Sequence, residues 1–287
     1  MGADNHAAEA ARRPAGGAAF GSPLAAAAPL AAQAPAPGGP VLRYCGTTLR
    51  GPARQTQQDA IVADGVVGVA DAAWLAGEVP LGAGEQVLLA VVDGIGGALG
   101  GAEAAGVAAA ELARLGRGPF PAAWTAALEA VSDRVGQAGA AWGLGRMGAT
   151  AALLVVGLEG VISANIGDCR AYRVDGSHLG QLSVDDSLPG GRPGVVTQSL
   201  GGGPRALDAH QYRAAHPPEA VARYLLCSDG LHGFVGRDQI LDGLVGAPSP
   251  AQAVRRLAAA ALAATRDNVS VLVADVLRPD QAARPSW

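Results

Sequence analysis

Apolar runs with the length of a β-strand alternate along this chain with longer alanine-rich stretches that have helical periodicity. Residues 87–92, with the sequence VLLAVV, are predicted to form a buried strand because the run is short and rich in valine. A glycine-rich turn follows. Residues 102–115 and 122–142 then predict two consecutive helices, which glycines and prolines separate.

The second half of the chain contains more of these short apolar runs. Strands are predicted at 150–156, 161–166, 170–174, 179–184, 222–227 and 268–276, and helices near 238–245 and at 250–264. The connections between the first four strands are so short that only antiparallel neighbours can form. Strands grouped with strands, and helices with helices, predict an α+β fold and not a doubly wound parallel sheet.

Composition excludes several classes of chemistry. All 21 basic residues are arginine, because the sequence contains no lysine. A Walker-type phosphate loop, Schiff-base catalysis and protein-kinase chemistry each need a lysine, so all three are excluded. The formal net charge of -4 gives no electrostatic reason for binding nucleic acid or an anionic membrane, and we expect neither as a partner.

The cysteines favour a reducing compartment. Cys45, Cys169 and Cys227 are odd in number and far apart, with no CxxC pair. This spacing argues against a disulfide framework and against a structural zinc site. We therefore expect a cytoplasmic protein in which Cys169 and Cys227 are small packing residues.

The chain is expected to contain one domain with a tail. Residues 1–40 are rich in alanine, proline and glycine, and they lack the periodicity that would let them bury one face. We expect a disordered tail at 1–40, a single domain at 41–278 and a flexible C-terminus at 279–287. The 49% apolar content is ample for the core of such a domain.

A secretory signal is the alternative interpretation of the tail. Arg12 and Arg13 precede a mildly apolar stretch, but Pro23 and Pro29 interrupt it. Elsewhere the chain has no apolar run long enough to span a bilayer.

Acidic residues stand at the ends of the predicted strands. Asp93, Asp168 and Asp229 each follow such a strand, and Asp267 comes just before the last one. A hairpin turn explains any single Asp-Gly pair equally well, and we assign Asp175 to a turn of this kind. If the other carboxylates converge at one rim, a hard divalent cation such as Mg²⁺ or Mn²⁺ would offset their repulsion through oxygen ligands.

A hairpin fits Asp93 poorly, because glycines and a predicted helix follow it where a hairpin needs a returning strand. A dinucleotide-binding turn is the natural alternative. The glycines at positions 94, 96 and 97 do not match G-x-G-x-x-G, since Leu99 stands at the third glycine position. Asp93 would also place negative charge beside a pyrophosphate.

Seven short motifs follow one another between residues 50 and 275. They are RQTQQDA at 54–60, VVDGIGG at 91–97, MGAT at 147–150, ANIGDCRAY at 164–172, TQSLG at 197–201, LLCSDGL at 225–231 and DNVSV at 267–271. Each motif alone is weak evidence. In this order they resemble the metal-dependent protein phosphatases of the type 2C serine/threonine family, in the bacterial form with a shortened flap.

The resemblance implies a four-layer αββα sandwich, in which two central antiparallel sheets are flanked by helix pairs. It also implies a site for two divalent cations, Mn²⁺ or Mg²⁺, at one edge of the sheets. Asp93, the Gly94 carbonyl, Asp229 and Asp267 correspond to the metal ligands. Asp168 corresponds to a ligand of a weaker third ion.

The same resemblance implies removal of phosphate from phosphoserine or phosphothreonine by an activated water. Arg54 corresponds to the arginine that binds the phosphate, and its planar fork suits two parallel hydrogen bonds. Asp59 corresponds to the acid that orients the water. The expected partner is a phosphorylated protein made by a Ser/Thr kinase, and the expected state is a monomer.

Several positions depart from the family pattern. Gln58 replaces a usual glutamate, Ala98 a usual histidine, and the acid usual nearby is displaced to Glu103. Asp186 stands within an Asp-Asp-Ser triplet where Asp-His-Ser is usual, and the segment between residues 187 and 197 is short for a flap. These departures leave open a catalytically weak domain that binds phosphorylated partners, and also a metal-stabilised structural domain.

Ordinary structural roles are expected for most of the remaining candidate residues. The sequence has no G-x-S-x-G elbow and no cysteine that opens a C-x5-R loop, so other phosphatase nucleophiles are not expected. His178, His210, His216 and His232 are expected to be solvated surface residues, with His232 a weak candidate near the site. Residues 71–85 are expected to form a surface hairpin or loop.

Overall fold

The structure of this chain is a computed structural model. It describes residues 39–95, 100–118, 120, 123–188, 190, 194–202, 206–216 and 221–278. Most of the expected N-terminal tail and the expected C-terminal segment therefore lie outside the described residues. Part of the second motif, at positions 96 and 97, and part of the short flap also lie outside them.

Two sheets form the centre of the fold, and every strand pairing between the described residues is antiparallel. The first sheet has the strand order β4-β1-β12-β11-β8-β9. Its strands are β1 (Val41–Leu49), β4 (Ala73–Pro80), β8 (Arg170–Asp175), β9 (His178–Gln181), β11 (Ala222–Cys227) and β12 (Val269–Leu277).

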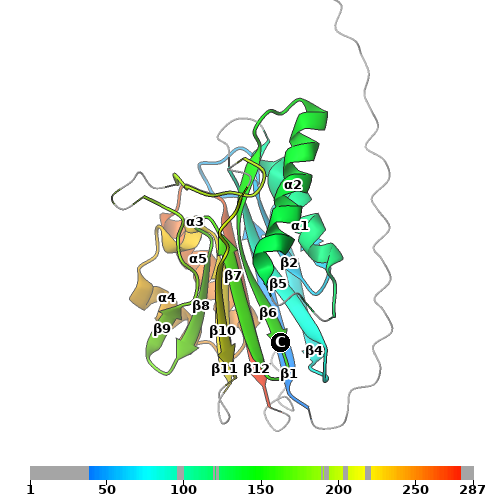
Figure 1. Cartoon of the computed structure of the whole chain (residues 1–287). Coiled ribbons are helices and arrows are strands. Elements are labelled where there is room, and N and C mark those ends of the chain that lie inside the picture. The colour runs from blue at the N-terminus through cyan, green and yellow to red at the C-terminus, as the bar shows by residue number, and fades with distance from the viewer. Residues whose placement is uncertain are drawn as a thin grey trace, which may run out of the picture. The chain divides into compact units, whose positions relative to one another are not determined.

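The second sheet has the strand order β10-β7-β6-β5-β2-β3. Its strands are β2 (Asp59–Ala63), β3 (Val66–Gly68), β5 (Gln86–Ile95), β6 (Gly148–Gly157), β7 (Gly160–Ile166) and β10 (His210–Ala215). Both sheets combine strands that are distant in sequence, so residues from many parts of the chain reach the same sheet edge (Figure 1).

Helices cover the outer face of each sheet. The helices α1 (Gly101–Arg114) and α2 (Trp124–Trp142) pack on the second sheet, while α4 (Arg237–Val245) and α5 (Pro250–Ala264) pack on the first (Figure 1). The short helix α3 (Asp229–His232) follows β11. This arrangement is the expected four-layer αββα sandwich. None of the helices in the described part of the chain is long and apolar enough to cross a membrane.

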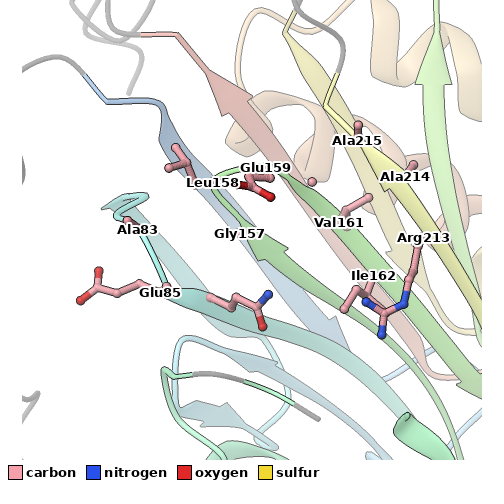
Figure 2. A pocket seen from close by; sticks show the side chains of 13 residues that line it. Ala83, Glu85, Gly157, Leu158, Glu159, Val161, Ile162, Arg213, Ala214 and Ala215 are labelled. Atoms are coloured by element: carbon pink, nitrogen blue, oxygen red, sulfur yellow. The ribbon is translucent and has the colours of Figure 1, made fainter. Parts of the chain in front are cut away.

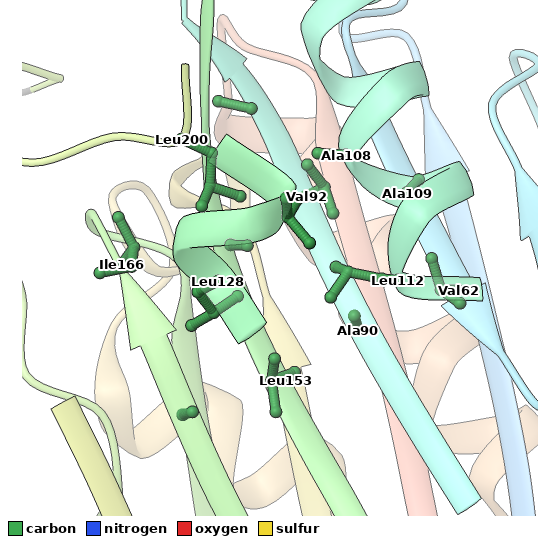
Figure 3. Packing of buried hydrophobic residues seen from close by; sticks show 14 of the residues in the cluster. Val62, Ala90, Val92, Ala108, Ala109, Leu112, Leu128, Leu153, Ile166 and Leu200 are labelled. Atoms are coloured by element: carbon green, nitrogen blue, oxygen red, sulfur yellow. The ribbon is translucent and has the colours of Figure 1, made fainter. Parts of the chain in front are cut away.

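The central strands are apolar throughout because both of their faces are buried. In β5, Leu88, Ala90 and Val92 point toward α1 and α2, whereas Val87, Leu89 and Val91 point toward the other sheet. This two-residue alternation is the geometry of a strand. Figure 3 shows the outer cluster, where Leu112 of α1 and Leu128 of α2 pack over Ala90 and Leu153.

The structure confirms the predicted helices and most of the predicted strands, with corrections at several boundaries. The predicted strand at 87–92 extends past Asp93 to Ile95, because pairing with β6 continues to the end of β5. The predicted strand at 179–184 ends at Gln181. The ladder stops there because the Ser183 hydroxyl, and not a backbone carbonyl, accepts from the Ala171 N–H.

The prediction of a surface hairpin or loop at 71–85 is wrong, because residues 73–80 form the single edge strand β4. This strand pairs with β1 along eight positions. The exposure of its side chains alternates for most of its length. Alanine, glycine and glutamate are poor strand formers, so the sequence did not indicate a strand here. The strands β1, β2, β3 and β10 were likewise not predicted.

Candidate active site

A pocket of about 270 Å³ lies where loops from both sheets meet. Asp93 reaches it from β5 and Asp168 from the turn between β7 and β8. Asp229 reaches it from the start of α3, and Asp267 from the residues just before β12. Arg54, between β1 and β2, completes this part of the wall. The acids predicted at strand ends therefore line one pocket.

Asp59 lies behind this wall, at the first position of β2. It is only 2% exposed and pairs across the sheet with Asp93 of β5. Its Oδ2 accepts hydrogen bonds from the hydroxyls of Ser228 (2.8 Å) and Ser270 (2.9 Å). Its Oδ1 is buried and has no hydrogen-bond partner. One oxygen is thus fixed, and the other remains available.

Gly94 allows backbones to approach one another closely at the pocket. Its N–H donates to the Gln58 carbonyl at 3.0 Å. A Cβ added at this position would lie 2.1 Å from the Gly101 carbonyl oxygen and 2.7 Å from that of Gln58. Only glycine fits here, because any side chain would separate the end of β5 from the start of α1.

Burial and mutual repulsion raise the pKa values of the clustered acids. Burial raises the pKa of Asp59 to about 6, and the two serine hydroxyls oppose the rise. Burial, with the charges of Asp168 and Asp267, raises the pKa of Asp229 to about 7. Asp93 has a pKa well above its usual range for the same two reasons, and burial also raises the pKa of Asp168.

Arg54 is the basic side chain that faces this cluster. Its Nη2 donates to Oδ2 of Asp267 at 2.5 Å. That hydrogen bond is the main cause of a raised pKa for Arg54, and burial opposes it. Asn268 ties the adjoining loops together, because its Oδ1 accepts from the Gln58 N–H and its Nδ2 donates to the Thr56 carbonyl.

The donors of the pocket fit divalent cations. They are carboxylate and carbonyl oxygens, which hard cations prefer. Oδ1 of Asp229, in the pocket, and Oδ1 of Asp59, behind its wall, are buried carboxylate oxygens without a hydrogen-bond partner. Such atoms are costly unless a donor or a cation meets them. Nevertheless, no group of three or more His, Cys, Asp or Glu in the described ranges is arranged to hold an ion. Asp267 instead bonds to Arg54.

Comparison with known proteins gives a consistent result. No family model matches the chain. The serine/threonine protein phosphatase PstP of Mycobacterium tuberculosis is 30% identical over 260 residues, which covers 84% of this chain. The solved catalytic domain of PstP, in complex with two manganese ions, is 28% identical with a TM-score of 0.62, covering 83% of this chain and 99% of that domain.

The chain belongs to the type 2C protein phosphatase family. PppA, described as a key regulatory component of T6SS in Pseudomonas aeruginosa, is a further structural neighbour. It is 25% identical with a TM-score of 0.64, covering 82% of this chain and 98% of PppA. The chain spans about half the length of the curated relatives it matches, since the alignment covers 46% of PstP.

The candidate site contains supporting residues that sequence reasoning missed. Ser228 and Ser270 hold Asp59, and Asn268 joins two loops. Each of the three stands beside or near a motif acid, but adjacency alone does not reveal a hydrogen bond to a residue far away in sequence. Thr150, in the motif at 147–150, lines the pocket, and its Oγ1 lies 3.2 Å from Sγ of Cys169.

Three of the histidines are less exposed than the sequence predicts. His178 is exposed as expected, but His210, His216 and His232 are partly buried and hydrogen-bonded. His232 lies next to the pocket, with its Nε2 3.0 Å from the Asp168 carbonyl oxygen, and burial lowers its pKa to about 4. Cys169 and Cys227 are buried packing residues, as predicted.

A larger cleft, of about 530 Å³, lies elsewhere (Figure 2). It is lined by the start of β5, the turn between β6 and β7, and the end of β10. Its charged residues are Glu85, Glu159 and Arg213. Gln86 in this cleft is seven positions from Asp93 along β5, roughly 23 Å at the usual strand rise. The cleft is therefore separate from the acidic pocket.

Proposed function

We propose that this chain is a metal-dependent phosphatase that removes phosphate from phosphoserine or phosphothreonine in proteins. The observation that carries the proposal is the convergence of Asp93, Asp168, Asp229 and Asp267 with Arg54 on one pocket. The family membership and the manganese complex of the PstP catalytic domain support it. The proposed substrate is a protein phosphorylated by a Ser/Thr kinase, and the proposed setting is a monomer in the cytoplasm.

Asp93, the Gly94 carbonyl, Asp229 and Asp267 would hold two divalent cations, Mn²⁺ or Mg²⁺, and Asp168 a weaker third. Bound there, the cations would offset the charge of the phosphate and make water a stronger nucleophile near neutral pH. Burial and mutual repulsion raise the pKa values of Asp93 and Asp229, and bound cations would relieve the repulsion.

The chain's own residues would bind the phosphate and orient the water. The Arg54 guanidinium presents a planar fork of N–H donors, which matches two phosphate oxygens. Asp59 would orient the attacking water by accepting a hydrogen bond at Oδ1, the oxygen that the serine hydroxyls do not hold. Ser228 and Ser270 would keep this carboxyl in one orientation by holding Oδ2. No nucleophile from the protein is needed.

Hydrolysis of p-nitrophenyl phosphate and of a phosphothreonine peptide, measured with and without Mn²⁺, tests the proposal. We expect Mn²⁺-dependent turnover in the wild type and a loss of at least about a hundredfold in Asp93→Asn and Asp229→Asn. Asp175→Asn is the matched control, because Asp175 is an exposed residue beside the turn between β8 and β9. Equal hydrolysis rates for the wild type and the two site variants would refute the proposed phosphatase activity.

One observation favours a second candidate function, a catalytically weak domain that binds phosphorylated partners. Gln58 lines the pocket where an acid is usual, and an amide supplies no charge to a cation. This domain would bind the phosphothreonine peptide in a Mn²⁺-dependent manner without hydrolysing it. Calorimetric titration with the peptide, run beside the turnover assay, separates the two functions.

A further inference from the structure

Asp186 is a buried carboxylate just outside the acidic pocket, and both of its carboxylate oxygens accept hydrogen bonds. It is 6% exposed and lies between β9 and the short flap. Oδ2 accepts from the Gly167 N–H at 2.7 Å. Oδ1 accepts from Nε2 of Gln198 at 2.9 Å and lies 2.9 Å from Nε2 of His210. Since a carboxylate oxygen accepts, the His210 Nε2 is the donor.

The contact with Gly167 fixes the turn that carries Asp168. The Asp186 backbone N–H also donates to the Gly167 carbonyl at 3.0 Å, so Gly167 is held on both sides. Gly167 has a φ of 90°, and an added Cβ would lie 2.3 Å from Cγ2 of Thr150. The next residue, Asp168, lines the pocket. A shift of Gly167 would therefore shift Asp168.

The backbone of Asp186 also holds a second segment that lines the pocket. Its carbonyl accepts from the Thr197 N–H at 2.7 Å and from the Thr197 hydroxyl at 3.2 Å. Ser187, which follows Asp186, and Val196, which precedes Thr197, form an antiparallel β-bridge. Gly194 and Val196, which precede Thr197, line the pocket. Asp186 thus joins two walls of the pocket that are separate in sequence.

Two side chains hold Asp186 from behind. Gln198 has a second set of hydrogen bonds, because its Oε1 accepts from the Asp208 N–H at 2.8 Å and its Nε2 reaches the Asp208 carbonyl at 3.3 Å. His210 begins the edge strand β10, which pairs with β7. The Asp186 carboxylate is therefore anchored to the sheet edge, and it transmits that anchoring to the Gly167 turn.

We propose that Asp186, anchored by His210 and Gln198, is a positioning residue that holds Asp168 and the wall at 194–197 in place. Its importance for the third-cation position rests on the proposed function, because Asp168 matters there as a ligand. Removal of the carboxylate frees the Gly167 N–H and both anchoring side chains.

Hydrogen–deuterium exchange of the full chain tests the positioning without metal or substrate. In Asp186→Ala we expect amide exchange at least about tenfold faster at 165–168 and at 196–199, because the Gly167 acceptor is lost. His210→Ala should give the same change to a smaller degree. His210→Gln should restore protection, because its amide N–H replaces the imidazole N–H. The exposed His178→Ala is the matched control.

Mn²⁺ titration, followed by the electron paramagnetic resonance of free Mn²⁺, tests the consequence for Asp168. Asp186→Ala should weaken the lower-affinity binding at least about tenfold and leave the tighter binding unchanged, as should Asp168→Asn. His210→Gln should bind as the wild type does. Thermal unfolding of each variant checks that it is folded, and His210→Ala takes the place of Asp186→Ala if the latter is not.

The outcomes separate this proposal from the proposed function. Unchanged exchange at 165–168 in folded Asp186 and His210 variants would overturn the positioning role, whatever the enzyme does. Faster exchange, with weak Mn²⁺ binding lost only in Asp168→Asn, would also overturn it. Faster exchange in a wild-type background that binds no Mn²⁺ and hydrolyses no phosphate would support the anchoring and refute the proposed function.

Discussion

At Asp93, burial and four neighbouring carboxylates all oppose ionisation. Asn keeps the shape of this side chain and removes its charge. In the metal-free protein at pH 8 we expect Asp93→Asn to raise the melting temperature, by about 2–4 °C for each kcal/mol of repulsion relieved. Mn²⁺ at a hundred times its Kd should stabilise the wild type by about 2.7 kcal/mol, and the variant hardly at all.

Differential scanning calorimetry with and without Mn²⁺ measures both effects, with Asp175→Asn as the control. A metal-free Asp93→Asn protein less stable than the wild type would contradict the repulsion argument. An equal response of both proteins to Mn²⁺ would contradict the ligand role.

Arg54 and a cation would compete for the same oxygen, because Arg54 bonds to Oδ2 of Asp267. We expect Arg54→Gln to raise KM for the phosphopeptide at least about tenfold, because the variant lacks the guanidinium that would bind two phosphate oxygens. The same variant should bind Mn²⁺ more tightly, because Asp267 is released. Calorimetric Mn²⁺ titration checks this, with the exposed Arg114→Gln as control. Weaker Mn²⁺ binding in Arg54→Gln would show that the arginine helps to build the site.

His216 gives the fold a pH dependence of known sign. Burial lowers its pKa below the ordinary 6.5, the charge of Arg173 acts in the same direction, and the hydrogen bond to Gly157 opposes both. The unfolded chain therefore takes up this proton first, and the stability contributed by neutral His216 is lost as pH falls from about 6.5 toward the lower folded pKa.

Denaturant unfolding of the wild type and His216→Gln between pH 8 and pH 5 isolates this effect from the acids, which both proteins share. The stability of the wild type relative to the variant should be constant above pH 7.5 and should fall below about 6.5. His178→Gln, at an exposed position, should give a flat difference across the range. A wild type that gains relative stability at pH 5 would reverse the assigned sign.

At the scale of elements, the packing of β5 against α1 depends on Gly94. Gly94→Ala places a methyl group 2.1 Å from the Gly101 carbonyl oxygen, so the two elements must separate. We expect a cost of about 1–3 kcal/mol and a loss of activity, because Asp93 moves with the strand. Gly180→Ala in β9 is the matched control, since its Cβ would meet nothing closer than 3.7 Å. Chemical denaturation that finds both variants equally stable would contradict this account.

The helices and central strands could be predicted because each has a local signature. The α5 helix begins after Ser249, whose Oγ accepts from the Gln252 N–H, and it has Pro250 at its first turn. Both signals are adjacent in sequence. The edge strand β4 carried no such signal, because what makes it a strand is its pairing with β1 and not its own composition.

At the scale of the whole molecule, the sheets must stay packed for the site to exist, because each sheet supplies acids to it. Leu272 of β12 is fully buried between the sheets. We expect Leu272→Ala to cost about 2–5 kcal/mol. Leu262→Ala, at a position on α5 that is 38% exposed, is the matched control and should be nearly neutral.

Thermal melts followed by circular dichroism and by Mn²⁺ binding should coincide in the Leu272 variant, because one cooperative unit holds the proposed metal ligands. A melt in which Mn²⁺ binding is lost well before secondary structure would show that the site loops unfold independently of the sheets.

The sequence by itself indicated the α+β class through its hydrophobic periodicity, and the family through seven motifs in order. Hydrophobic periodicity is a local property, and acids placed at strand ends can be read without knowing which strands are neighbours. Tertiary structure alone decided which acids meet. The register of β2 against β5 brings Asp59 to Asp93, and loops 213 residues apart bring Arg54 to Asp267. Pairing across that distance depends on the packing of the whole chain, which no local pattern records.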